Sequence, residues 1–186
     1  AYLRRSGRFA YVRGSEMVRV THAHGGWERV DGLFRRPPRS TAEVAAIASG
    51  RAFRPISVEL ERPRAIPQRC RMSAVETLGE QLLGQSVQRW SVTSDSTMLS
   101  GWRGDRALLF EDCRGDEELA LVARVLFRTR RNAARAMAAL EHGQRRRFRR
   151  GRSLERRNIS LTEMERSRYV ALAVEGPQLL ICIGFG

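Results

Sequence analysis

The chain contains no lysine, although 34 of its 186 residues are basic, so every basic residue is an arginine. Only 20 residues are acidic, which leaves a formal net charge of +14. A coding bias that replaces lysine codons explains the missing lysine at little physical cost on a solvated surface. It does not explain the excess of positive charge, because a biased sequence can equally keep its net charge near zero. The excess predicts a polyanionic partner, with nucleic acid first and anionic membrane second.

Long apolar runs and cysteine are also scarce. No stretch approaches the ~20 apolar residues of a membrane-spanning helix, and the start shows no signal-peptide pattern. The three cysteines, Cys70, Cys113 and Cys182, are odd in number and far apart. This usage argues against a disulfide framework and for a reducing compartment, either the mitochondrial matrix or, alternatively, the cytoplasm.

Residues typical of catalytic and metal sites are few. His22 and His24 lie two positions apart, and neither has a further histidine or cysteine nearby, so we expect no metal and no cofactor. No glycine-rich phosphate loop, paired Cys/His finger or aromatic ribonucleoprotein signature is present. We therefore expect no catalytic residues, although His142 beside an arginine cluster keeps open a small metal-independent endoribonuclease. Arg103-Gly104-Asp105 matches an adhesion tripeptide, which is too short a motif to count.

The apolar share of 42% is enough for a folded core, and we predict a single α+β domain over residues 15–186. A basic N-terminal arm over residues 1–14 precedes it. Its first 13 residues carry four arginines and no acid. They resemble an organelle transit peptide or its retained remnant, and a simple basic arm remains the alternative.

The predicted architecture is an N-terminal antiparallel β meander, two short helices, one long amphipathic helix and a C-terminal β hairpin. The meander occupies residues 8–34, where short apolar runs alternate with glycine turns. Capping boxes at Ser40–Glu43 and Ser73–Glu76 begin the two short helices. The remaining elements are a buried strand at 106–110, the long helix at 116–141, and a hairpin of strands 169–174 and 179–183.

Arginine is densest at residues 144–157. This segment contains eight arginines and one acidic residue, Glu155, so its net charge is +7. Upstream, four arginines recur at spacings of four, three and four, which places them on one face of the predicted long helix. Phe148 within the run is positioned to stack on a base. The predicted nucleic-acid-binding residues are Arg4, Arg5, Arg8, Arg124, Arg128, Arg131, Arg135, Arg145, Arg146, Arg147, Phe148, Arg149, Arg150, Arg152, Arg156 and Arg157.

These features predict an RNA-binding structural subunit of a large ribonucleoprotein, most simply a ribosomal protein that contacts the phosphate backbone through arginine, with a mitochondrial ribosome as the leading example. Its expected partners are ribosomal RNA and neighbouring protein subunits. Besides the endoribonuclease, a basic interaction subunit of a membrane or viral assembly remains an alternative.

Overall fold

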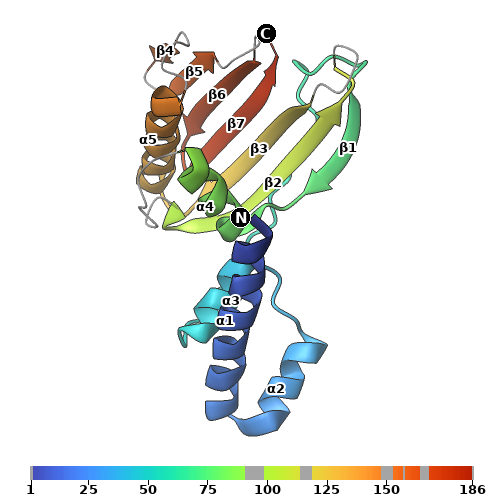
Figure 1. Ribbon diagram of the computed structural model, residues 1–186, viewed down its shortest axis with the longest axis vertical. Helices are drawn as coiled ribbons and strands as arrows, with labels where there is room; N and C mark the ends of the chain where they lie inside the picture. Colours follow the sequence, from blue (N-terminus) through green and yellow to red (C-terminus); the bar gives the residue numbers. More distant parts are fainter. Residues whose placement is uncertain are drawn as a thin grey trace. The chain divides into compact units, whose positions relative to one another are not determined.

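A computed structural model describes residues 2–90, 99–113, 119–147, 153–156, 158–163 and 168–185 (Figure 1). The chain divides into two compact units, residues 1–55 and 56–186. That boundary differs from the one between residues 14 and 15 that the sequence suggested. The first unit is helical, and all the strands lie in the second.

The predicted N-terminal β meander was wrong, because residues 8–34 form two helices and the turn between them. Unit 1 consists of α1 (Tyr2–Ala23), α2 (Gly26–Arg35) and α3 (Thr41–Ala48). The predicted cap of α3 is confirmed, since Ser40 accepts a hydrogen bond from the Glu43 amide at 3.1 Å. Helix α3 buries Ala42, Ala46 and Ala48, and small side chains let it pack closely against α1. That packing outweighs the strand-like alternation of Met17–Val20, which spans too few residues to decide the local structure.

Unit 2 is built on a seven-stranded antiparallel sheet in the order β1-β2-β3-β7-β6-β5-β4. Strands β6 and β7 form the C-terminal hairpin, but as the middle of this sheet and not as a separate closing element. The strands are β1 (Arg71–Glu76), β2 (Trp102–Glu111), β3 (Ala120–Phe127), β4 (Ser153–Arg156), β5 (Ile159–Glu163), β6 (Arg168–Glu175) and β7 (Gln178–Phe185).

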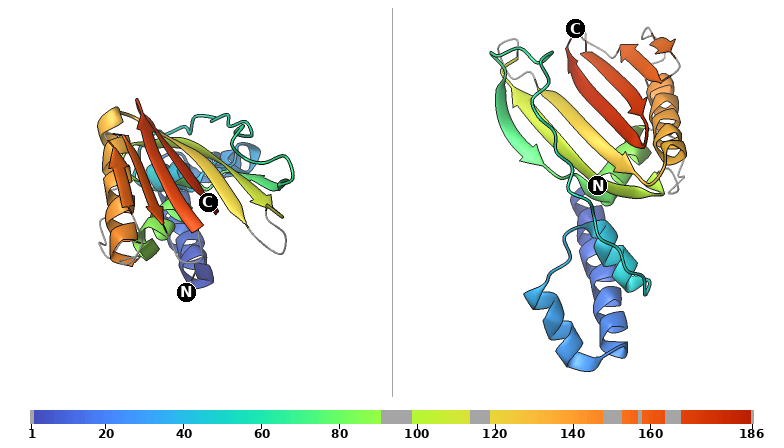
Figure 2. Two further views of the ribbon diagram at one scale, coloured as in Figure 1. Left: turned by 90° about the horizontal axis from the view of Figure 1, so that it is seen from above. Right: turned by 180° about the vertical axis from the view of Figure 1, so that it is seen from behind.

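The two faces of this sheet are covered differently. Helices α4 (Gly79–Trp90) and α5 (Arg130–Arg147) pack on one face, where Ala133, Met137 and Leu140 of α5 are buried. An extended segment, residues 56–70, crosses the other face over β2 and β3, and we call it the strap (Figure 2). Leu60 and Ile66 of the strap pack on a small core there. The fold class is α+β, but the predicted order of helices and strands along the chain was wrong.

The long helix at 116–141 was also wrong. Residues 120–127 form β3, and the helix begins only at Arg130. A strand covered on both faces is apolar at nearly every position, so its residues match a helical spacing as well as a strand. The break lies at Thr129, whose hydroxyl accepts a hydrogen bond from the Asn132 amide at 3.2 Å and caps α5.

The second predicted capping box, Ser73–Glu76, lies instead in β1, and α4 begins at Gly79. Its start is held by Asp105 of β2, which is 3% exposed. The Asp105 carboxylate accepts hydrogen bonds from the amides of Leu78 at 2.6 Å and Gly79 at 2.9 Å. It also accepts one from the Trp102 indole at 3.0 Å. A buried carboxylate distant in sequence therefore supplies the helix cap. Because Asp105 is buried, the Arg103-Gly104-Asp105 tripeptide is not available at the surface as an adhesion motif.

Burial raises the pKa of Asp105 above its ordinary value of 3.8, against the lowering effect of its three hydrogen bonds. The folded state therefore holds this proton more tightly than the unfolded state does. We compare the free energy of unfolding of the native protein with that of Asp105→Asn. The advantage of the native protein should be largest below pH 3.8. The advantage should shrink as the pH rises through the raised pKa, as measured by urea unfolding at several pH values. A difference that grew with pH would contradict this assignment.

Within the part of the chain that the structure describes, no helix is both long enough and apolar enough to cross a bilayer.

Candidate functional site

The outer face of α5 carries a stripe of positive charge. Arg131, Arg135 and Arg146 are exposed and lie four and eleven residues apart, which places them on one stripe of the helix. His142 is exposed on the same stripe. The stripe spans about 22 Å at 1.5 Å per residue. We call these three arginines together with His142 the α5 stripe.

Little acid opposes this charge. Helix α5 contains six arginines and one acidic residue, Glu141, and its first turn has no acid. None of the three stripe arginines forms an ion pair with a carboxylate among the described residues. The opposite side of the helix is buried, with Ala136 and Leu140 at 1% and 2% exposure. A rigid helix anchored on one face thus holds unpaired guanidinium groups in the solvent on the other.

The four arginines that sequence spacing placed in one row do not form one. Arg124 lies in β3 on the face that the strap crosses, where Nη1 donates to the Glu59 carbonyl at 3.0 Å. Arg128 is exposed in the turn between β3 and α5, with its amide bonded to the Gly101 carbonyl at 2.6 Å. Only Arg131 and Arg135 lie on the helix. The structure brings these two together with Arg146, which the sequence had assigned to the following run.

The structure describes the other predicted nucleic-acid-binding residues less completely. Arg145 is exposed near the end of α5, and the backbone of Arg147 ends that helix. The backbones of Arg4, Arg5 and Arg8 lie in α1, and that of Arg156 lies in β4. Phe148, Arg149, Arg150, Arg152 and Arg157 fall outside the described residues. A base-stacking role for Phe148 therefore remains a prediction.

The histidines do not converge on one site. His22 lies in the last turn of α1, and its ring is 4.7 Å from that of Trp27 in an edge-to-face arrangement. The Nδ1 atom of His24 lies 2.7 Å from the Val20 carbonyl, so this side chain closes the end of α1. Among the described residues no group of three or more histidine, cysteine or acidic side chains is arranged to hold a metal ion.

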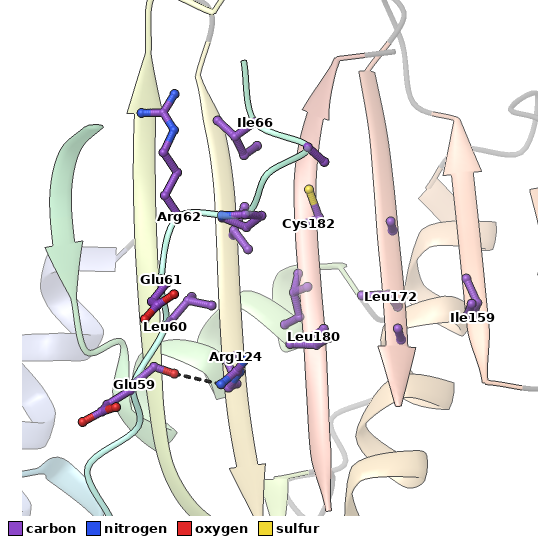
Figure 3. A pocket seen from close by; sticks show the side chains of 16 residues that line it. Glu59, Leu60, Glu61, Arg62, Ile66, Arg124, Ile159, Leu172, Leu180 and Cys182 are labelled. Carbon is purple, nitrogen blue, oxygen red and sulfur yellow. Dashed lines mark hydrogen bonds between the residues drawn. The ribbon is translucent and has the colours of Figure 1, made fainter. Parts of the chain in front are cut away.

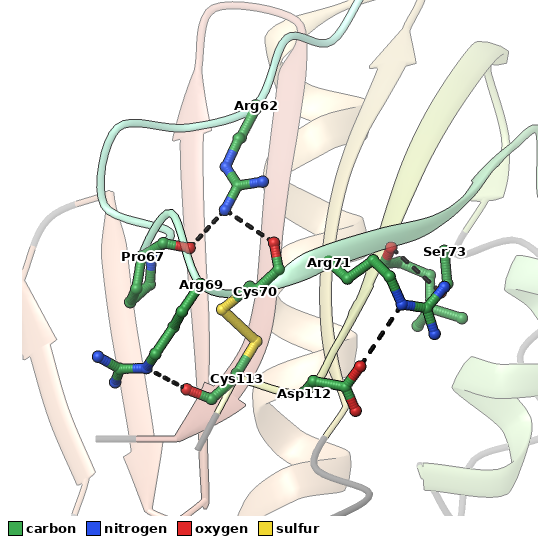
Figure 4. The surroundings of a disulfide bond; sticks show 9 residues. Arg62, Pro67, Arg69, Cys70, Arg71, Ser73, Asp112 and Cys113 are labelled. Atoms are coloured by element: carbon green, nitrogen blue, oxygen red, sulfur yellow. Dashed lines mark hydrogen bonds and ion pairs between the residues drawn. A yellow bond between two sulfur atoms is a disulfide. The ribbon is translucent and has the colours of Figure 1, made fainter. Parts of the chain in front are cut away.

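Cys70 and Cys113 form a disulfide, a pairing that the odd cysteine count had argued against (Figure 4). It ties the end of the strap to the end of β2. Arg62 Nη2 donates to the Cys70 carbonyl at 3.0 Å, and Arg69 Nε donates to the Cys113 carbonyl at 2.6 Å. Disulfides persist mainly in oxidising compartments, so this bond does not fit the reducing setting that we expected.

No protein-family model and no curated protein sequence matches the chain. Among solved structures, the extracellular domain of PknH from Mycobacterium tuberculosis is similar over 62% of this chain and 71% of that one. The sequence identity is 13% and the TM-score is 0.37, a likeness too weak to support an argument about function.

Proposed function

We propose that this protein is a non-enzymatic binding protein that holds a phosphate polymer, RNA in the first place, against the outer face of α5. The observation that carries the proposal is the α5 stripe itself. It holds guanidinium groups that have no ion-pair partner among the described carboxylates, on a helix whose opposite face is buried. The arginine run at 147–157 continues from the end of this helix in sequence.

Counterion release supplies the driving force. Each phosphate that an arginine neutralises frees a condensed cation, and a planar guanidinium donates to two phosphate oxygens at once. The net charge of +14 adds a long-range attraction and is compensated by the bound polymer. Because nothing along α5 matches a base-reading motif, binding is expected to depend on the backbone and only weakly on base sequence.

The test is a charge reversal on the stripe. Arg131→Glu, Arg135→Glu and Arg146→Glu together should weaken binding of a fluorescent oligouridine by about tenfold or more, as measured by anisotropy. The slope of log affinity against log salt should become shallower by about 2, because three contacts each contribute roughly 0.7 for a single strand.

The matched control reverses Arg35, Arg36 and Arg51, which are exposed in unit 1. Both triple variants lower the net charge by six, so a purely non-specific attraction would weaken equally in both. Equal loss in the two variants, or unchanged binding in the stripe variant, would refute the assignment. Recovery of intact RNA after incubation, with native protein and with His142→Ala, separates binding from the endoribonuclease alternative.

The disulfide favours a second candidate, a basic interaction subunit at an anionic membrane or viral surface in an oxidising compartment. Co-sedimentation with vesicles that contain phosphatidylserine tests this candidate. Co-sedimentation should be lost when the vesicles are neutral, and it should also be lost in the stripe variant. The finer expectation of a ribosomal protein in the mitochondrial matrix stays a prediction, and the disulfide does not favour it.

A further inference from the structure

A groove of about 670 Å³ lies on the strap face of the sheet, opposite to α5 (Figure 3). This volume is within the ~300–1,000 Å³ range of small-molecule sites. The strap forms one wall, with Leu60 and Ile66 facing the groove. Residues of β3, β7, β6 and β5 form the floor.

The register of the strands defines the floor. Arg124, Leu180, Ala173 and Ile159 are successive cross-strand partners on β3, β7, β6 and β5. All four line the groove. Three strand-to-strand steps at about 4.8 Å give this row a length of about 14 Å. This row runs from a cation, Arg124, to an apolar residue, Ile159. The other cation of the lining is Arg62 of the strap, which donates to the Cys70 carbonyl.

A second row of cross-strand partners lies beside the first on the floor. Val122, Cys182 and Ala171 are cross-strand partners and also line the groove. The floor is hollow because β6 contributes only alanine to both rows, at positions 171 and 173. At the far end of the first row Ile159 is 54% exposed, although it is a large aliphatic side chain. An apolar floor of this kind is more stable when an apolar molecule covers it.

Arg124 determines what kind of molecule fits. Its guanidinium makes one hydrogen bond, from Nη1 to the Glu59 carbonyl, and forms no ion pair with a described carboxylate. Its Nε atom is buried and has no partner among the described residues. Glu59 and Glu61 also line the groove, and both residues are exposed to solvent. A half-buried cation that lies beside apolar surface and has no anionic partner is energetically costly. A carboxylate can pair with a guanidinium group through two hydrogen bonds.

We propose that the groove binds a single-chain amphiphile with a carboxylate head, such as a medium-chain fatty acid. The carboxylate pairs with Arg124, and the acyl chain lies across Leu180, Ala173 and Ile159. This site is on the face opposite to the α5 stripe, so it is independent of the proposed function.

Calorimetric titration with decanoate tests the proposal. Native protein should bind decanoate, and Arg124→Met should bind it at least about tenfold more weakly, because a charged hydrogen bond is lost while the apolar floor remains. Decanol, which lacks the charge, should bind both proteins weakly and alike. Equal affinity of decanoate for native protein and Arg124→Met would overturn the assignment of the head group.

Ala173→Phe provides a second variant that leaves Arg124 and the strap contact in place. The aromatic ring should fill the floor and abolish decanoate binding, whereas Ala138→Phe on the exposed side of α5 should leave binding unchanged. Both variants are checked for native folding by circular dichroism. Undiminished binding in Ala173→Phe would show that the chain does not lie on the floor.

Cys182 reports the location independently. It is the free cysteine of the described chain, lies on the floor, and has a pKa raised by burial, so labelling is done at mildly alkaline pH. Bound decanoate should slow its alkylation by a small maleimide several-fold in native protein. The stripe variant should show the same protection, and unprotected Cys182 in the presence of saturating decanoate would place binding elsewhere.

Discussion

Replacing Asp105 by alanine is expected to lower the free energy of unfolding of residues 56–186 by about 3 kcal/mol or more. The carboxylate serves the amides of Leu78 and Gly79 and the indole of Trp102, and the variant leaves all three donors without this acceptor. Each buried donor left without an acceptor costs roughly 1–3 kcal/mol. Urea unfolding followed by tryptophan fluorescence measures the change.

The control for this variant is Asp112→Asn. Asp112 is exposed and pairs with Arg71 at 3.5 Å, and asparagine tolerates its positive φ of 59°. An exposed ion pair contributes ~0–1 kcal/mol, so this substitution should change the unfolding free energy little. Similar losses in the two variants would contradict the role of Asp105 as the acceptor that joins β2 to the start of α4.

The second large effect concerns the disulfide. Cys70 and Cys113 are 43 residues apart, and closing a loop of that length stabilises the folded state by about 4 kcal/mol in the chain-entropy account. We expect Cys70→Ala with Cys113→Ala, or reduction of the native protein, to lower the unfolding free energy by roughly 2–4 kcal/mol. Both cysteines are buried, at 2% and 7% exposure, so lost packing adds to the effect.

Thiol counting checks the bond before stability is measured. The chain has three cysteines, and Cys182 is free, so denatured protein should react with one equivalent of thiol reagent without reductant and three with it. Cys182→Ala serves as the stability control, because it removes a thiol without opening the loop. Three reactive thiols before reduction would remove the structural ground for an oxidising compartment.

The α5 stripe and the groove place similar arginines in different physical settings. Arg131 and Arg135 are exposed at the surface of a helix, where salt screens them and where only a polymer of phosphates gains much by binding. Arg124 is half-buried beside apolar side chains, where a single anion gains more. The spacing of four, three and four residues that grouped these arginines in sequence therefore joined two unlike environments.

Sequence by itself determined the features that depend on neighbours along the chain. The capped start of α3 at Ser40 follows from one hydroxyl and the amide three residues later. The hairpin of β6 and β7 follows from two apolar runs joined by a Gly-Pro turn. The large arginine excess is a count, and it is independent of the fold.

Tertiary structure alone decided the rest. Residues 120–127 are apolar at helical spacing, and they became a strand because both faces of the sheet are covered, one by α5 and the other by the strap. The Cys70–Cys113 pairing and the cap that Asp105 supplies to α4 join residues far apart in sequence. The position of Arg124 on the floor of the groove depends on the register of four strands. Local spacing carries no information on such contacts, because their energy comes from groups that only the folded chain brings together.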